Sequence, residues 1–165
     1  MSLLDLPLVR RTRRNHGLEH ATIHVLSARF PGRSIAGRST PYGFYIFSDF
    51  PTDEVASAAR EALARMRGGE QRLAVHPGCG TNYLTSGVFA GLAAFAALGL
   101  GKRNRWEQLP NAITAATLGL FLAAPVGPLL QTRFTTSGDM ADLEIVSVRQ
   151  LPGRVRLHYV ETRSA

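Results

Sequence analysis

Three histidines and one glutamate fall within nine residues near the start of this 165-residue chain. They are His16, Glu19, His20 and His24, in the stretch RRNHGLEHATIHVLS. An α-helix turns by about 100° per residue, so residues four apart lie nearly above one another. The spacing therefore predicts a column of three imidazoles on one helix face, with Glu19 about 60° to one side of His16. Imidazole is a common metal ligand, so the pattern favours a metal site.

A second segment, HPGCG, carries two more residue types that bind metals, His76 and Cys79. The intervening Pro-Gly pair is typical of a tight turn that could direct both side chains at one point. Zinc takes imidazole nitrogen and thiolate in tetrahedral geometry, closed with four protein ligands or open and catalytic with three and a water. The expected ligands are His20, His24, His76 and Cys79, with His16 as a substitute. We expect Glu19 to be a partner of a ligand or the catalytic general base.

The stretch HGLEH also resembles the HxxEH motif of the inverted-zincin metallopeptidases. The resemblance implies that His16 and His20 bind zinc and that Glu19 is the general base. In that family a glutamate from a later helix is the third ligand. Glu54 and Glu61 lie on a later predicted helix here, although closer in sequence than the family pattern places that ligand.

Two long uncharged stretches, residues 83–101 and 109–131, predict a transmembrane hairpin. Spanning a bilayer takes roughly 20 apolar residues. The intervening segment contains residue types found at the headgroup level, namely Lys102, Arg103, Arg105 and Trp106. Two buried helices of a soluble protein are the alternative, but the length and the lack of a polar face favour the membrane.

Small residues recur four apart in both stretches, which predicts close packing of the two helices in lipid. The pairs are Gly87 and Gly91, Ala90 and Ala94, Ala115 and Gly119, and Ala123 and Gly127.

The remaining segments predict an α+β domain. Helices are expected over residues 8–30 and 51–69, strands on either side of a turn at residues 41–43, a short strand in QRLAV at 71–75, and a C-terminal β-hairpin around the turn LPGR at 151–154. Strand-forming residues of this hairpin are Ile145, Val148, Val155, Leu157 and Tyr159. We expect the N-terminal part, residues 1–82, and the C-terminal part, residues 132–165, to form one soluble domain around the helical hairpin of residues 83–131.

Three motifs in this order, NHGLEHATIHVL, HPGCGTN and an Ala/Gly-rich membrane hairpin, resemble a family of small uncharacterised bacterial membrane proteins with two spans. The resemblance implies the organisation proposed above and no particular activity.

The chain is basic, with 19 Lys+Arg against 12 Asp+Glu and a net charge of +7. Such a balance fits nucleic acid or an anionic membrane surface. The arginines of RRTRR at residues 10–14 are expected to contact anionic lipid headgroups, with a solvated helix face as the alternative. Nucleic acid is disfavoured because no recognisable binding fold or aromatic platform accompanies the charge. Binding to a membrane protein partner, or to a second copy of the chain, is a further alternative.

The expected location is the inner (cytoplasmic) membrane, crossed more than once, with the soluble domain in the cytosol. The first apolar stretch precedes its positive charges, the reverse of a secretory signal. Cys79 is the only cysteine, which favours a reducing compartment. Basic residues flank both ends of the hairpin in nearly equal number, so the positive-inside rule hardly distinguishes the two orientations of the hairpin in the membrane.

The first hypothesis is a small integral membrane protein whose soluble domain binds a transition metal, zinc above all. The competing hypothesis is a non-catalytic membrane scaffold that recruits a partner without metal, in which the histidines make only structural hydrogen bonds. Haem ligation by two of the histidines is a further alternative, although no CxxCH motif is present. A membrane-anchored HxxEH zinc hydrolase or peptidase is the third hypothesis, so enzymatic activity stays undecided. His158, in the last predicted strand, is expected to be structural.

Overall fold

The computed structural model describes residues 3–99, 105–153 and 156–164. The chain divides into two compact units, one combining Met1–His76 with Thr132–Ala165 and the other comprising Pro77–Gln131. Several residues used in the predictions lie outside the described residues, namely Lys102, Arg103, Arg154, Val155, and residues 100–101 at the end of the first predicted span.

The first unit contains two long helices, both predicted from the sequence. Helix α1 spans Pro7–Arg29, after the short 3-10 helix η1 at Leu3–Asp5. Proline suits the first position of α1 because the amide hydrogen that it lacks would have no partner within the helix. Helix α2 spans Thr52–Arg67 and is followed by the 3-10 helix η2 at Gln71–Ala74.

The same unit contains one antiparallel sheet whose strands come from both ends of the chain. Strands β1 (Ala36–Thr40) and β2 (Gly43–Phe47) precede the apolar helices, and β3 (Glu144–Leu151) and β4 (Leu157–Arg163) follow them. The strand order is β1-β2-β4-β3, so β2 pairs with β4 in the middle of the sheet. The predicted α+β class is therefore confirmed, with one sheet built from N- and C-terminal segments.

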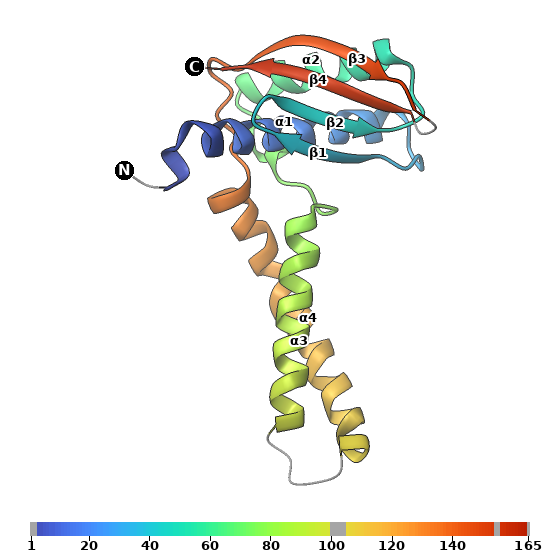
Figure 1. Cartoon of the computed structure of the whole chain (residues 1–165), viewed down its shortest axis with the longest axis vertical. Helices are drawn as coiled ribbons and strands as arrows, with labels where there is room; N and C mark the ends of the chain where they lie inside the picture. The colour runs from blue at the N-terminus through green and yellow to red at the C-terminus, as the bar shows by residue number, and fades with distance from the viewer. Residues whose placement is uncertain (1–2, 100–104, 154–155, 165) are drawn as a thin grey trace. The chain divides into compact units, whose positions relative to one another are not determined.

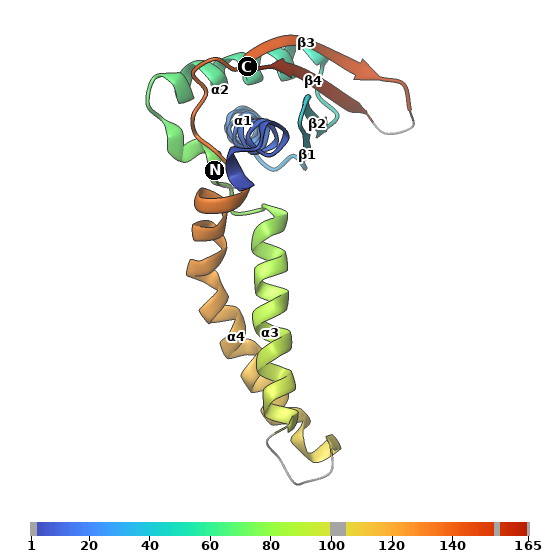
Figure 2. The same cartoon turned by 60° about the vertical axis from the view of Figure 1, so that its left-hand side comes forward.

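Helices α1 and α2 cover one face of this sheet and enclose the hydrophobic core (Figures 1 and 2). Side chains from both helices and from the central strands β2 and β4 are fully buried there, including Leu18, Leu26, Phe44, Ile46, Val55 and Val160. Each such side chain stabilises the fold by about 1.5–3 kcal/mol relative to an exposed one. The alternation of buried and open positions along β2 and β4 follows from the two-residue period of a strand.

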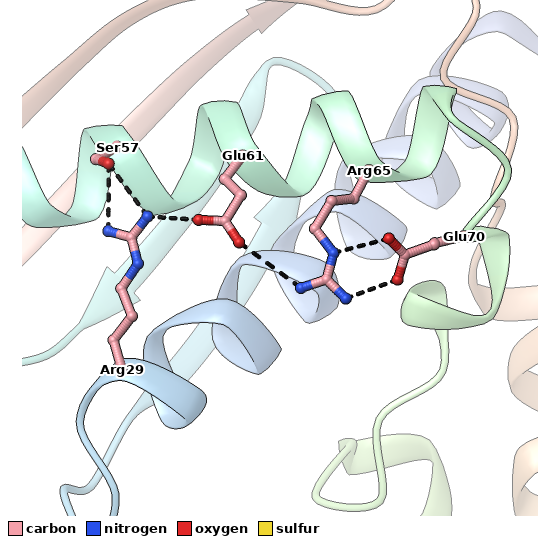
Figure 3. A network of polar contacts seen from close by, with 5 residues as sticks. All are labelled: Arg29, Ser57, Glu61, Arg65 and Glu70. Carbon is pink, nitrogen blue, oxygen red and sulfur yellow. Dashed lines mark hydrogen bonds and ion pairs between the residues drawn. The ribbon is translucent and has the colours of Figure 1, made fainter.

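A chain of ion pairs fastens the C-terminal end of α1 to α2 (Figure 3). Arg29 contacts Glu54 at 3.1 Å and Glu61 at 2.6 Å, and Arg65 binds Glu70 at 2.6 Å. Arg65 also lies 3.7 Å from Glu61. The two glutamates considered above as a third zinc ligand therefore both engage Arg29.

The second unit is a hairpin of two apolar helices. Helix α3 spans Gly80–Gly99, and α4 (Leu109–Leu130) follows the 3-10 helix η3 at Arg105–Gln108. The last turn then changes to a π-helix, η4, at Gln131–Thr135. A polar contact joins the two helices, since Gln131 Nε2 donates to Asn82 Oδ1 at 2.7 Å.

Only some of the predicted small residues form the contact between α3 and α4. A Cβ at Gly119 would lie 2.7 Å from the carbonyl oxygen of Phe89, and one at Gly127 would overlap Asn82. Added Cβ atoms at Gly87 and Gly91 would meet nothing within 4 Å. Gly119 and Gly127 of α4 therefore allow α3 to pack closely against α4. Gly87 and Gly91 of α3 lie away from this contact.

Most of the apolar surface of this hairpin is open. Of the most apolar 18-residue window, 6% is buried in Gly80–Gly99 and 17% in Trp106–Thr135. Large side chains such as Phe95 and Phe121 are exposed. A core helix of a soluble protein would bury these residues, so the exposure matches the predicted membrane spans. Both helices are long and apolar enough to cross a membrane.

Candidate metal centre

Helix α1 places His16, His20 and His24 in a column, as the four-residue spacing predicts. The ring centroids of His16 and His20 are 4.4 Å apart. The rings face the carbonyls of Ala74 at the end of η2, of Val75 after it, and of Thr135 at the end of η4.

Each of the three imidazoles contacts one backbone carbonyl. His16 Nδ1 lies 2.9 Å from the oxygen of Thr135, and His20 Nδ1 lies 2.7 Å from that of Ala74. His24 makes the corresponding contact at 2.9 Å through Nε2, to the oxygen of Val75.

A carbonyl oxygen only accepts hydrogen bonds, so the contacting ring nitrogen must carry the hydrogen and donate. In the neutral ring the other nitrogen then holds the lone pair: Nε2 in His16 and His20, and Nδ1 in His24. Histidines that bind metals are held in this way, with the second ring nitrogen donating to a carbonyl or carboxylate. The backbone carbonyls thus orient three imidazole rings and fix which nitrogen of each neutral ring has the lone pair that a metal ion would need.

The segment that presents the carbonyls of Ala74 and Val75 does not form the short strand predicted at residues 71–75. It is the 3-10 helix η2, followed by the extended residue Val75. Two of its carbonyls accept from histidine rings instead of from a neighbouring strand, because α1 lies alongside. The strand prediction was wrong because these partners lie about fifty residues away in the chain.

His76 follows this segment and joins the cluster. Its ring centroid lies 4.7 Å from that of His24 and 5.7 Å from that of His20. Burial, with smaller contributions from His24 and His20, lowers the pKa of His76 to about 4. The ring is therefore neutral at pH 7, the form in which imidazole binds a metal.

Glu19 lies against strand β1. Its carboxylate is buried and accepts a hydrogen bond from the hydroxyl of Ser39. The approach depends on Gly37, since a Cβ there would overlap the carboxylate. The catalytic role of Glu19 stays a prediction.

Asn15 and Gly17 also fix the position of α1, and the sequence reasoning did not single them out. Asn15 Nδ2 donates to the oxygen of Thr40 at 2.9 Å, and its Oδ1 accepts from the Thr162 hydroxyl at 2.6 Å. A Cβ on Gly17 would overlap the carbonyl oxygen of Ser137. The signal that could have revealed both is an amide and a glycine within an otherwise bulky helical stretch.

Two of the arginines expected at lipid headgroups are used within the unit. Arg13 donates to the backbone oxygens of Arg133 and Thr136, each at 3.1 Å. Arg14 is buried and forms an ion pair with Asp142 at 2.5 Å. Both residues hold the chain that leads back towards β3.

The structure therefore brings His16, His20, His24 and His76 together within one unit. Cys79 belongs to the other unit, Pro77–Gln131, three residues after His76, and is buried. His158 is fully buried in β4, opposite Ile46 of β2, as expected of a structural histidine.

Residues 11–148 match the family described as a domain of unknown function (DUF6391). This chain belongs to that family. The DUF6391 match includes all five candidate ligands, Glu19 and both apolar helices. The chain is also 37% identical, over 135 residues, to an uncharacterised protein of Picosynechococcus sp. (strain ATCC 27264 / PCC 7002 / PR-6). That alignment covers 76% of this chain and 65% of the relative, so the chain spans less than two thirds of the relative's length. No solved structure matches the DUF6391 chain.

Proposed function

We propose that this DUF6391 protein is an integral membrane protein whose α+β unit binds a transition-metal ion, zinc in particular. The observation that carries the proposal is the set of carbonyl contacts at His16, His20 and His24, which assigns a lone pair to one nitrogen of each ring. Histidines that bind a metal usually donate their second ring nitrogen to a carbonyl or carboxylate in this way.

Cys79 supplies the thiolate in this proposal. Three residues of extended chain span at most about 10–11 Å. Cys79 follows His76 by three residues, so its backbone stays within that reach of the His76 backbone. The group of His16, His20 and Cys79 contains ligand types that could hold a metal ion. Two imidazoles and one thiolate suit zinc, with the fourth position taken by another histidine or by water.

The membrane part of the proposal is supported by length, composition and topology. Two helices are long and apolar enough to cross a bilayer and leave most of their surface open. Strands β2 and β4 precede and follow these helices, and they pair directly. Paired strands must lie on one side of a membrane, so the intervening chain must cross it an even number of times. Two spans satisfy that condition.

Metal analysis of the full chain in detergent tests the binding site. We expect close to one equivalent of zinc in the wild type, and less than about 0.2 equivalents after His20→Ala or Cys79→Ser. His24→Ala separates two ligand sets, since it lowers the metal content only if His24 is a ligand. Substitution with cobalt gives a readout of its own, because a thiolate–cobalt charge-transfer band appears only when Cys79 binds the ion.

Wild-type protein without metal, together with an unchanged zinc affinity in the variants, would overturn the proposal and favour a scaffold that recruits partners. The variants must keep the wild-type circular dichroism spectrum for this comparison.

The proposed location is the cytoplasmic membrane, with the α+β unit in the cytosol. A single reporter at Ala141→Cys, in a Cys79→Ser background, tests this orientation because Ala141 is exposed. We expect a membrane-impermeant maleimide to label inverted vesicles and not intact cells. Labelling of intact cells would reverse the orientation.

A further inference from the structure

The outer face of the sheet is a second surface with the composition of a binding site. Helices α1 and α2 cover one face only, and among the described residues of this unit no helix lies on the other (Figure 2). The core side of the sheet is marked by Phe44, Ile46 and Val160, which are buried. The alternating residues therefore point outward, namely Tyr45 and Phe47 of β2 and Leu157, Tyr159 and Glu161 of β4.

One row of outward residues crosses all four strands at the same level. Arg38 of β1 pairs with Tyr45 of β2, Tyr45 pairs with Tyr159 of β4, and Tyr159 pairs with Arg149 of β3. The two tyrosine rings have centroids 4.9 Å apart and are tilted by 44° to one another, and the guanidinium carbon of Arg149 lies over the Tyr159 ring, 5.5 Å from its centre. The row therefore consists of two adjacent aromatic rings, with exposed Arg38 beside Tyr45 and exposed Arg149 against the face of Tyr159.

The neighbouring row is apolar and adjoins a hollow. Its members in strand order are Ala36, Phe47, Leu157 and Leu151. Together with Arg38 and Tyr45, three of them line a cavity of about 730 Å³ that extends to the edge of β1. On the other side of the aromatic row the face becomes acidic at Glu161, whose carboxylate accepts from the Ser147 hydroxyl. An anionic ligand is therefore expected over the arginine and apolar rows and not beyond Glu161.

We propose that this outer face binds single-stranded nucleic acid. Tyrosine rings and arginine guanidinium planes both stack on bases of any sequence, and guanidinium groups also neutralise the neighbouring phosphates. Aromatic rings adjacent to arginines match the bases and phosphates of a single strand, whereas a bilayer surface offers no bases to stack on, so the arrangement favours nucleic acid over lipid. The platform was invisible in the sequence because the two tyrosines are distant in the chain and become neighbours only through the pairing of β2 with β4.

Fluorescence anisotropy with the full chain in neutral detergent and a labelled twelve-nucleotide RNA or DNA tests this proposal. We expect Tyr45→Leu and Tyr159→Leu each to weaken binding by about tenfold or more, because leucine keeps the apolar volume and removes the stacking face. Tyr45→Phe keeps that face and should bind within about twofold of the wild type. Tyr42→Leu, at the exposed turn between β1 and β2, is the matched control.

Salt dependence tests the arginines independently. Arg38→Gln and Arg149→Gln should each reduce the slope of log affinity against log salt by about 0.7, one phosphate contact of a single strand. Arg60→Gln, an exposed arginine on α2, should leave the slope unchanged.

Several outcomes would overturn the proposal: no binding of either oligonucleotide at 50 mM salt, equal losses in Tyr45→Leu and the Tyr42→Leu control, or equal changes in slope in Arg38→Gln and Arg60→Gln. Anionic vesicles provide a separate arm. If Tyr45→Leu weakens binding to vesicles and not to oligonucleotides, the face binds lipid and the nucleic-acid assignment fails. The metal content serves as a second readout that should not change in any of these variants.

Discussion

The two sides of helix α1 use polar side chains in opposite ways. On the sheet side, the amide group of Asn15 both donates and accepts, to Thr40 of β1 and from Thr162 of β4. On the histidine side, each of three rings uses one nitrogen to hold a backbone carbonyl, and the neutral ring has a lone pair on the other. The first arrangement fixes the helix, whereas the second orients three imidazole rings along one face of it. A helix can therefore be a structural clamp and a ligand-bearing surface at once.

Gly17→Leu should be the most damaging single change. Even a Cβ at this position overlaps the carbonyl oxygen of Ser137, so a larger side chain must displace the returning backbone. We expect a loss of about 3 kcal/mol or more in the free energy of unfolding, despite the better helix propensity of leucine. Chemical denaturation in detergent measures this loss. Gly87→Ala, where a Cβ meets nothing within 4 Å, is the control and should be nearly neutral.

Asn15→Leu should remove the hydrogen bonds between α1 and the sheet and leave the histidine contacts in place. The part-buried backbone oxygen of Thr40 and the buried hydroxyl of Thr162 would lose their partner, at a cost of about 2–3 kcal/mol. Metal content should stay at the wild-type level. The double variant with Thr162→Val should lose less stability than the sum of the two single losses, because the residues interact directly. Loss of metal in Asn15→Leu would show that the two sides are not independent.

Acid should weaken the fold through the histidines whose pKa is lowered. Burial lowers the pKa of His76 to about 4 and also lowers that of His158, to which Arg156 contributes. The unfolded chain then binds more protons than the folded chain below about pH 6.5, so stability is complete above that pH and falls towards pH 4. For the metal-free protein, His76→Asn should remove on the order of 2 kcal/mol of this fall. Unfolding curves at pH 7 and pH 4.5 provide the measurement; an unchanged difference would contradict the assignment.

Glu19→Gln should have the smallest effect on stability. The hydrogen bond from Ser39 persists but loses its charged acceptor, which costs about 1 kcal/mol. Metal content should stay unchanged, because Glu19 lies against β1. If metal is lost, Glu19 is itself a ligand and the division between the two sides fails. If metal stays and a hydrolytic activity disappears, the general-base prediction is supported.

The sequence predicted the elements that depend on local patterns and missed the contacts between distant segments. Apolar periodicity and strand-forming residues were enough for α1, α2, the two strand pairs and the apolar helices. The histidine column also followed from spacing alone. The sequence could not show that the carbonyls of Ala74 and Val75 accept from that column, so a strand was predicted where η2 forms. The spacing of small residues likewise identified Gly119 correctly but not the open position of Gly87.

The pairing of β2 with β4 also sets the order in which the protein can be completed during translation. Residues 43–47 leave the ribosome early, but the strand that pairs with them begins only at Leu157. Until then the edge of β2 exposes backbone amide and carbonyl groups to any other strand. The nascent chain must therefore keep its first half partly assembled while both apolar helices are synthesised. A stop codon anywhere between the two strands would leave an open edge prone to aggregation.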